Sequence, residues 1–214
     1  MAWHPILRTR LAEVLSALGG DAPTLCEGWR TRHLAAHLVL RQSDPLYALA
    51  ALAPALADRA EAQVQTLGGT ADDESGFASL VARVAGGGPT WSPLHLAGDR
   101  AELLELVVHT LDATRGAGRS DLDLEPELAE AVWARLVRGA PLLLRHVPVG
   151  VVLVQPDGPR ARAHRPRAGT GTVVVRGPLP DLALYCFGRR AAARVHLEGT
   201  PDDLAMLQDS VISA

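Results

Sequence analysis

The first two-thirds of the chain repeat apolar residues at helical spacing. In the opening segment the apolar side chains fall on one stripe, and a pair of glycines ends it. That stripe consists of Ile6, Leu7, Leu11, Val14, Leu15 and Leu18. Further helices are predicted from Thr31 to about Gln42, from Pro45 onward with a kink at Pro54, around Phe77 to Val84, from about Asp99 to Arg115, and from Pro126 to about Arg145.

After His146 the pattern changes. Two runs rich in β-branched residues, VGVVLVQ and GTVVVRG, predict strands, and the alternating RARAHRP lies between them. A short helix at LPDLALYCFG, a strand at AARVHLEG and a last helix from Pro201 follow. We therefore expect an α+β protein with an up-down helical bundle over residues 1–145 and a small α+β domain over residues 146–214.

Charge and composition exclude some classes of partner. The 214 residues include 21 basic residues, all arginine, and 24 acidic residues, so that 21 − 24 gives a net charge of −3. This balance argues against nucleic acid or an anionic membrane as the main partner. Two distant cysteines, an amphipathic first segment and the lack of a run of about 20 apolar residues predict a soluble, cytoplasmic protein.

One predicted helix contains candidate metal ligands. In the segment ELVVHTLDATRG, Glu105 and His109 are four residues apart and therefore share a helix face, with apolar residues between them. They could be a hydrogen-bonded pair in the core. They could also be two ligands of a metal site, with His37 from another apolar helix as the third. The spacing alone leaves both interpretations open.

The motifs around these residues resemble a known family. TLCEGWRTRHLAAHL, followed by an ExxxHxxD helix and the ending FGRRAAARVHLEGTPDDLAML, is similar to the DinB-like, mycothiol-dependent maleylpyruvate isomerase family. The resemblance implies a metal-binding helical bundle joined to a small α+β domain, and His37, Glu105 and His109 as the metal ligands. It also implies mycothiol as co-substrate and a tail arginine that contacts a substrate anion. Arg189 or Arg190 is the candidate for this contact, and the alternative is that both are a solvated charged pair on the surface.

The ligand set predicts the kind of metal. Two imidazoles and one carboxylate suit Zn²⁺ best, with Ni²⁺ as the alternative, and leave one position for water or a substrate atom. His33 departs from the family pattern, which has an aspartate there. We expect His33 to be exposed near the helix start, and a His33/His37 ligand pair is the less favoured alternative.

Other residues have both structural and functional interpretations. Cys26 could be a ligand or nucleophile, but a structural role in the turn is favoured. Trp29 is expected to pack or to act as a lid, and Asp112 either orients a ligand or pairs with Arg115. The remaining histidines are expected to face solvent: His4, His95, His146, His164 and His196.

Two functions remain after this reading. The favoured one is an enzyme, a metal- and thiol-dependent isomerase or transferase acting on a small electrophile. Its metal would lower the pKa of a bound thiol or polarise a carbonyl group. The alternative is a non-catalytic module in which the metal stabilises the bundle or is sensed.

Overall fold

The computed structural model describes residues 2–50, 54–89, 98–119 and 122–212. The chain divides into two compact units, Met1–Leu122 (unit 1) and Asp123–Ala214 (unit 2). Within the described ranges, no helix combines the length and the apolar character that a bilayer span requires. The predicted α+β fold class is confirmed.

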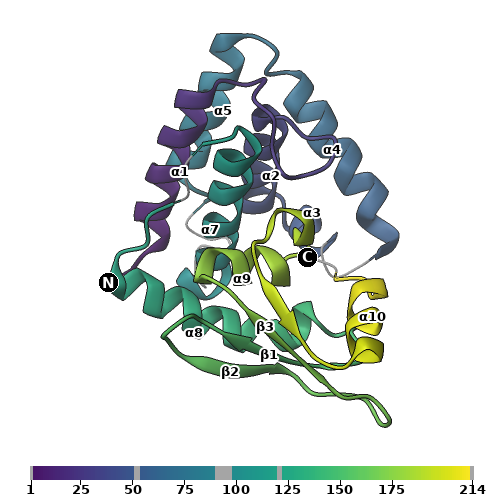
Figure 1. Ribbon diagram of the computed structural model, residues 1–214. Helices are drawn as coiled ribbons and strands as arrows, with labels where there is room; N and C mark the ends of the chain where they lie inside the picture. The colour runs from purple at the N-terminus through teal and green to yellow at the C-terminus, as the bar shows by residue number, and fades with distance from the viewer. Residues whose placement is uncertain (1, 51–53, 90–97, 120–121, 213–214) are drawn as a thin grey trace. The chain divides into compact units, whose positions relative to one another are not determined.

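The named secondary-structure elements of unit 1 within its described residues are all helices, joined by turns and loops (Figure 1). The predicted helix starts at Thr31, Pro45 and Asp99 are confirmed, and Pro54 begins a short 3₁₀ turn where a kink was expected. Residues 51–53 lie outside the described part of the chain. The elements are α1 (His4–Leu18), α2 (Thr31–Ser43), α3 (Pro45–Ala50), η1 (Pro54–Leu56), α4 (Ala57–Gly69), α5 (Glu74–Gly86) and α7 (Asp99–Gly116).

The core of unit 1 lies where α1 packs on α5 and α7 and where α2 packs on α4 and α5. Helix α2 also contacts α7, which brings the two helices with candidate ligands together. A buried ion pair between Arg8 and Glu102 joins α1 to α7. Fully buried side chains of this core include Leu7, Leu11, Leu15, Leu34, Leu38, Leu103, Leu106 and Leu111.

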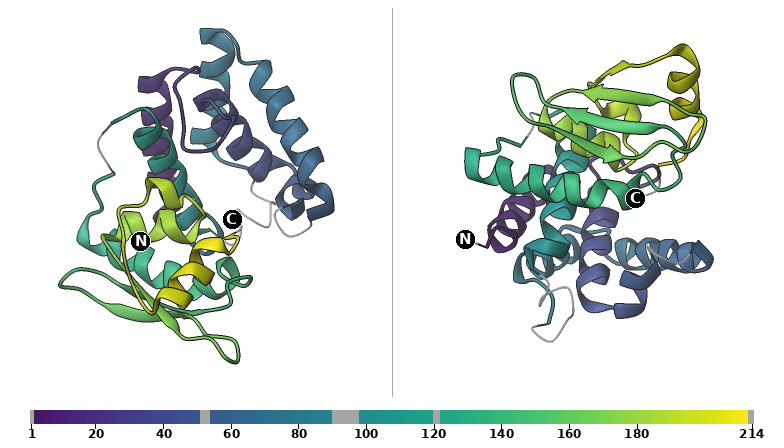
Figure 2. Two further views of the ribbon diagram at one scale, coloured as in Figure 1. Left: turned by 45° about the vertical axis from the view of Figure 1, so that its right-hand side comes forward. Right: turned by 90° about the horizontal axis from the view of Figure 1, so that it is seen from below.

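Unit 2 contains a mixed sheet in the order β2-β1-β3-β4 among its described residues (Figures 1 and 2). Strand β1 runs parallel to β3 and antiparallel to β2, and β4 runs antiparallel to β3. Alternate residues of the two central strands are buried, as expected for a sheet covered on one face. The elements are α8 (Pro126–Leu143), β1 (Gly150–Val154), β2 (Arg160–His164), β3 (Thr172–Arg176), α9 (Leu179–Cys186), η2 (Arg190–Ala192), β4 (His196–Glu198) and α10 (Pro201–Asp209).

Helix α8 belongs to unit 2, not to the helical bundle. The sequence predicted a boundary at 145/146, whereas the two compact units divide between Leu122 and Asp123. The reason is that α8 packs against β2 and α9. Its buried stripe consists of Leu128, Val132, Leu136 and Ala140. The helix itself was predicted correctly, but its apolar stripe covers the α+β unit.

Candidate metal centre

Two helices of unit 1 supply the three predicted ligands. His37 lies on α2, while Glu105 and His109 lie one turn apart on α7. Their ligand atoms form a close triangle: His37 Nε2 is 3.1 Å from Glu105 Oε1, and His109 Nε2 is 3.2 Å from both. We call this set the His–Glu–His triangle. The structure therefore brings together the residues that the sequence predicted as ligands.

The separations in the triangle suit a tetrahedral metal site. Zinc binds imidazole nitrogen and carboxylate oxygen at about 2.0–2.2 Å, which places two ligand atoms of a tetrahedron about 3.3–3.5 Å apart. The observed 3.1–3.2 Å differ from this by a few tenths of an ångström. These three residues meet the donor chemistry and the spacing of a divalent metal centre.

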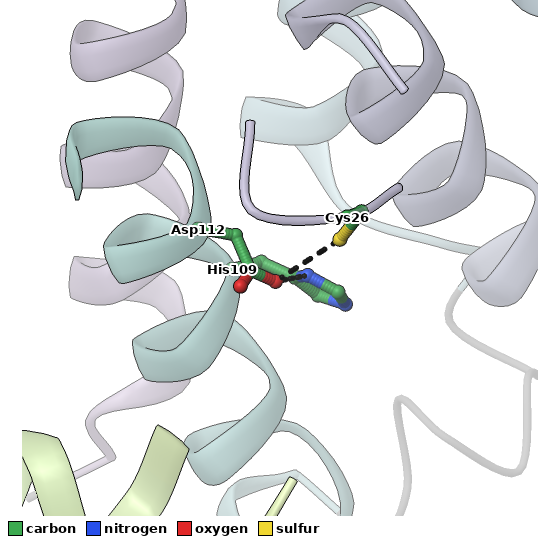
Figure 3. A group of neighbouring side chains, drawn as sticks. All are labelled: Cys26, His109 and Asp112. Atoms are coloured by element: carbon green, nitrogen blue, oxygen red, sulfur yellow. Dashed lines mark hydrogen bonds and ion pairs between the residues drawn. The ribbon is translucent and has the colours of Figure 1, made fainter. Parts of the chain in front are cut away.

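The outer nitrogen of each imidazole has a hydrogen-bond partner. His109 Nδ1 lies 2.9 Å from Asp112 Oδ2, and His37 Nδ1 lies 2.7 Å from the hydroxyl of Tyr47. Asp112, buried on the same helix as His109, accepts the Nδ1 proton (Figure 3). Because a carboxylate only accepts, the neutral His109 ring donates from Nδ1 and keeps the lone pair of Nε2, its atom in the triangle. The Tyr47 hydroxyl can donate or accept, and Nε2 is again the atom of His37 that lies in the triangle.

A fourth side chain adds charge to the triangle. Arg41, one turn after His37 on α2, places its Nε 3.3 Å from Glu105 Oε1. Burial opposes ionisation of Glu105, but Arg41 and the two histidines outweigh it and hold the pKa of this carboxyl well below its usual range. Glu105 is therefore a carboxylate at neutral pH.

The two histidines differ in their electrostatic surroundings. Burial lowers the pKa of His37. Burial also opposes protonation of His109, but its hydrogen bonds with Asp112, Cys26 and Glu105 outweigh this and raise its pKa well above the usual value. The carboxylates of Glu105 and Asp112 lie near a single guanidinium, that of Arg41. The surroundings of the triangle therefore favour the binding of a further positive charge, either a proton or a metal ion.

Two residues of the turn before α2, Cys26 and Trp29, contact side chains that surround the triangle. The Cys26 thiol donates to Asp112 Oδ2 at 3.3 Å, so Asp112 serves both Cys26 and His109. The Trp29 ring lies 5.3 Å from that of His37, and its Nε1 donates to Glu61 at 3.1 Å. The orienting role considered for Asp112 and the packing role considered for Trp29 agree with these contacts.

His33 and His4 differ from their predicted exposure. His33 is only 8% exposed, and its Nδ1 accepts a hydrogen bond from the backbone N–H of Arg30 at 3.0 Å. A glycine at position 68 of α4 leaves room for the ring, because a Cβ there would lie 2.5 Å from His33 Cδ2. His4 pairs with Asp99 at 2.7 Å. Both predictions of solvent exposure were wrong.

The other predicted histidines do not join the triangle in the described structure. His146 and His196 are exposed and His164 is half-buried, while His95 lies outside the described residues.

The tail arginines lie in unit 2 and are half-buried. Arg190 donates to the Gln208 carbonyl at 2.9 Å and to Ser210 Oγ at 3.1 Å, and its guanidinium lies 5.5 Å from the Tyr185 ring centroid. Arg189 donates to the Phe187 carbonyl at 2.7 Å. These contacts tie the end of α9 to neighbouring backbone.

Sequence reasoning missed Arg41 and Tyr47. Arg41 could have been found, because it follows His37 by four residues and must share its helix face. Tyr47 lies on the next helix, so its approach to His37 depends on how the chain turns after α2.

Glu105 also lines a narrow hollow between α2 and α7, together with Arg41 and Glu102.

Comparisons with known proteins address the fold. No protein-family model matches the chain, and no curated protein sequence matches it. Two solved structures do: the mycothiol-dependent maleylpyruvate isomerase and a histidine-to-alanine mutant of that enzyme, with TM-scores of 0.53 and 0.54. Each has 18% sequence identity, and each alignment covers 92% of this chain and 93% of the other. The chain thus has the fold of the mycothiol-dependent maleylpyruvate isomerase, and the resemblance drawn from its motifs is confirmed at the level of the fold.

Proposed function

We propose that unit 1 binds one divalent metal ion through His37 Nε2, the Glu105 carboxylate and His109 Nε2. The observation that carries this proposal is the His–Glu–His triangle, in which three electron-pair donors lie 3.1–3.2 Å apart. Such a cluster is stable only when a proton or a metal ion lies between its members. Zn²⁺ is the proposed ion, with Ni²⁺ as the alternative, because nitrogen and oxygen ligands suit both.

The surrounding residues support a catalytic rather than a closed site. Three protein ligands leave a fourth position for water or substrate, as in catalytic zinc centres. Asp112 and Tyr47 orient the imidazoles, and Arg41 keeps Glu105 ionised. When bound, the metal would supply Lewis-acid chemistry that lowers the pKa of a thiol ligand or polarises a carbonyl oxygen.

We propose that the chain is a thiol-dependent isomerase or transferase acting on a small electrophile, with mycothiol as its co-substrate. The shared fold and the TLCEGW and ExxxH motifs support this activity. Arg189 or Arg190 is the proposed contact for a substrate carboxylate, since a guanidinium binds such a group in a bidentate manner. The reducing cytoplasm is the proposed location, where Cys26 and Cys186 would remain free thiols.

The test combines metal analysis with turnover. Metal content of the purified protein is measured by mass spectrometry, and then for His37→Ala, Glu105→Gln and His109→Ala. Thiol-dependent isomerisation of maleylpyruvate and addition of mycothiol to related electrophiles are measured before and after metal removal. About one metal ion per chain with metal-dependent turnover supports the proposal.

Two other outcomes have distinct meanings. Metal binding without turnover of any of these substrates would favour the non-catalytic metal-binding module. Purified protein that neither contains nor takes up Zn²⁺ or Ni²⁺ would leave a hydrogen-bonded His–Glu–His cluster in a helical core.

A further inference from the structure

The segment between α1 and α2 is attached to α7 beside the metal centre. We call residues 21–30 the TLCEGW loop. The backbone N–H of Leu25 donates to the carbonyl oxygen of Asp112 at 3.0 Å. Thr24 lies against Gly116, where an added Cβ would be 2.4 Å from the Thr24 Cα. Only glycine fits there without a backbone shift, so the loop and the end of α7 are closely packed.

The side chain of Asp112 connects this loop to a ligand. Its Oδ2 accepts hydrogen bonds from the Cys26 thiol at 3.3 Å and from His109 Nδ1 at 2.9 Å (Figure 3). Asp112 is 0% exposed, so water does not compete for this oxygen. Because Asp112 follows His109 by three residues on one helix, a single carboxylate reaches the imidazole and also faces the loop.

Cys26 lies outside the His–Glu–His triangle, in a second group with His109 and Asp112. Cys26 and Asp112 meet the Nδ1 edge of His109, whereas His37 and Glu105 meet its Nε2 edge. A thiol on the Nδ1 edge acts on the triangle through Asp112. The same loop places Trp29 beside His37, so it contacts the surroundings of both imidazoles.

We propose that Asp112 and Cys26 are positioning residues of the metal centre: the Cys26 thiol holds the Asp112 carboxylate, which in turn holds His109 with Nε2 directed at the metal. This inference rests on the metal assignment under Proposed function. Under this inference, Cys26 of the TLCEGW loop helps to position a metal ligand. The loop sets the orientation of a ligand from outside the ligand set, and a serine can replace the thiol because it also donates.

The experiment measures the metal in the full chain. Zn²⁺-loaded wild type, Asp112→Asn, Cys26→Ala and Cys26→Ser are mixed with an excess of chelator, and affinity and dissociation rate are recorded. Co²⁺-loaded samples give the ligand-field absorption spectrum. The Nδ1 proton of His109 is followed by ¹⁵N-resolved NMR in the Zn²⁺-loaded protein. Asp99→Asn is the matched control, because Asp99 is a hydrogen-bonded aspartate of the same helix that contacts His4 and not the triangle.

We expect Asp112→Asn to weaken Zn²⁺ binding by roughly 10- to 100-fold, the range found when a partner of a ligating histidine is removed. Cys26→Ala should weaken binding by about 2- to 10-fold, as for one lost hydrogen bond, and Cys26→Ser should stay near wild type. The Co²⁺ spectrum and the Nδ1 proton signal should change in Asp112→Asn and remain unchanged in Asp99→Asn. A role in stability alone would move melting temperatures and leave these two spectra as in wild type.

The outcomes separate this inference from the proposed function. If wild type binds Zn²⁺ and Asp112→Asn binds it equally well with the same spectra, the positioning role is wrong and the metal assignment stands. If wild type binds no metal, the proposed function fails first and the positioning role fails with it. If Asp112→Asn does not fold, the two Cys26 variants test the inference instead. Equal Zn²⁺ affinities of Cys26→Ala and Cys26→Ser would overturn the positioning role of Cys26.

Discussion

Glu105→Gln tests the metal assignment most directly, because it removes a charge and keeps the shape. The amide can still accept a hydrogen bond from Arg41, whose Nε lies 3.3 Å from Glu105 Oε1. The stability of the metal-free protein should therefore change little. Metal affinity should fall by about 100-fold, since an anionic ligand that sits 3.1 and 3.2 Å from the two imidazoles becomes neutral.

The expected melting temperatures follow from mass action. A metal present at 100 times its dissociation constant stabilises the folded protein by about 2.7 kcal/mol, and at a concentration equal to that constant by about 0.4 kcal/mol. Unit 1 spans Met1–Leu122. Its unfolding entropy is about 0.26 kcal/mol/K, at roughly 2.1 cal/mol/K per residue. Metal should raise the melting temperature by about 10 °C in wild type and about 1–2 °C in Glu105→Gln. If the whole chain unfolds together, the wild-type shift is about 6 °C.

The assay is thermal unfolding followed by circular dichroism, with chelator or with added Zn²⁺ at one fixed concentration. Glu13→Gln removes an exposed carboxylate from α1 and serves as the charge control, so it should keep the wild-type shift. An equal metal-induced shift in Glu105→Gln and wild type would refute the assignment of Glu105. A large loss of stability in metal-free Glu105→Gln would instead favour the hydrogen-bonded cluster.

Three further predictions test the surroundings of the site. Arg8→Met should lower the free energy of unfolding by about 3–5 kcal/mol, because it leaves Glu102 buried without its partner; denaturant unfolding should show most of this loss recovered in Arg8→Met/Glu102→Leu. Zn²⁺ affinity should fall as pH drops below the raised pKa of His109, since a proton on this imidazole then competes with the metal. The fall should begin above about pH 6.5, the pKa of an unperturbed histidine. Calorimetry at several pH values measures the affinity, and a constant affinity down to pH 6 would contradict this prediction. Gly116→Ala should cost about 1–3 kcal/mol, because its Cβ would overlap Thr24; Gly86→Ala, where a Cβ meets no atom within 4 Å, should be nearly neutral in the same unfolding assay.

Apolar periodicity predicted the helices but not which unit each belongs to. The stripe of α1 is buried at Leu7, Leu11 and Leu15, as its spacing requires. Helix α8 has an equally clear stripe, yet that stripe packs on β2 and α9. An apolar stripe shows that one face of a helix must be buried, but it does not show which element buries that face. The boundary at 145/146 was therefore a prediction from the change in local pattern, and tertiary packing overrode it.

The candidate site shows the same limit. Glu105 and His109 could be predicted as neighbours because one helix fixes their geometry. His37 was the candidate third ligand from its apolar helix, and the motif resemblance favoured the metal interpretation of all three. The burial of His33 could not be predicted from its own segment, since Gly68 of α4 makes the room for its ring. Tyr47 reaches His37 only because the chain turns between α2 and α3. The burial of His33 and the approach of Tyr47 to His37 each depend on two elements, which local reasoning does not supply, whereas Arg41 lies on the helix of His37 and was within its reach.

The charges around the triangle connect its geometry to the proposed chemistry. Metal binding requires both imidazoles to be neutral. In that state, with Glu105 and Asp112 ionised and Arg41 protonated, the set has a net charge of −1. A divalent ion changes this to +1 in a partly buried setting, where Glu105 and His37 side chains are only 19% and 16% exposed. Charge interactions are stronger there than in water. Such a centre favours an anionic fourth ligand over a neutral one, which is the condition under which a bound thiol would lose its proton.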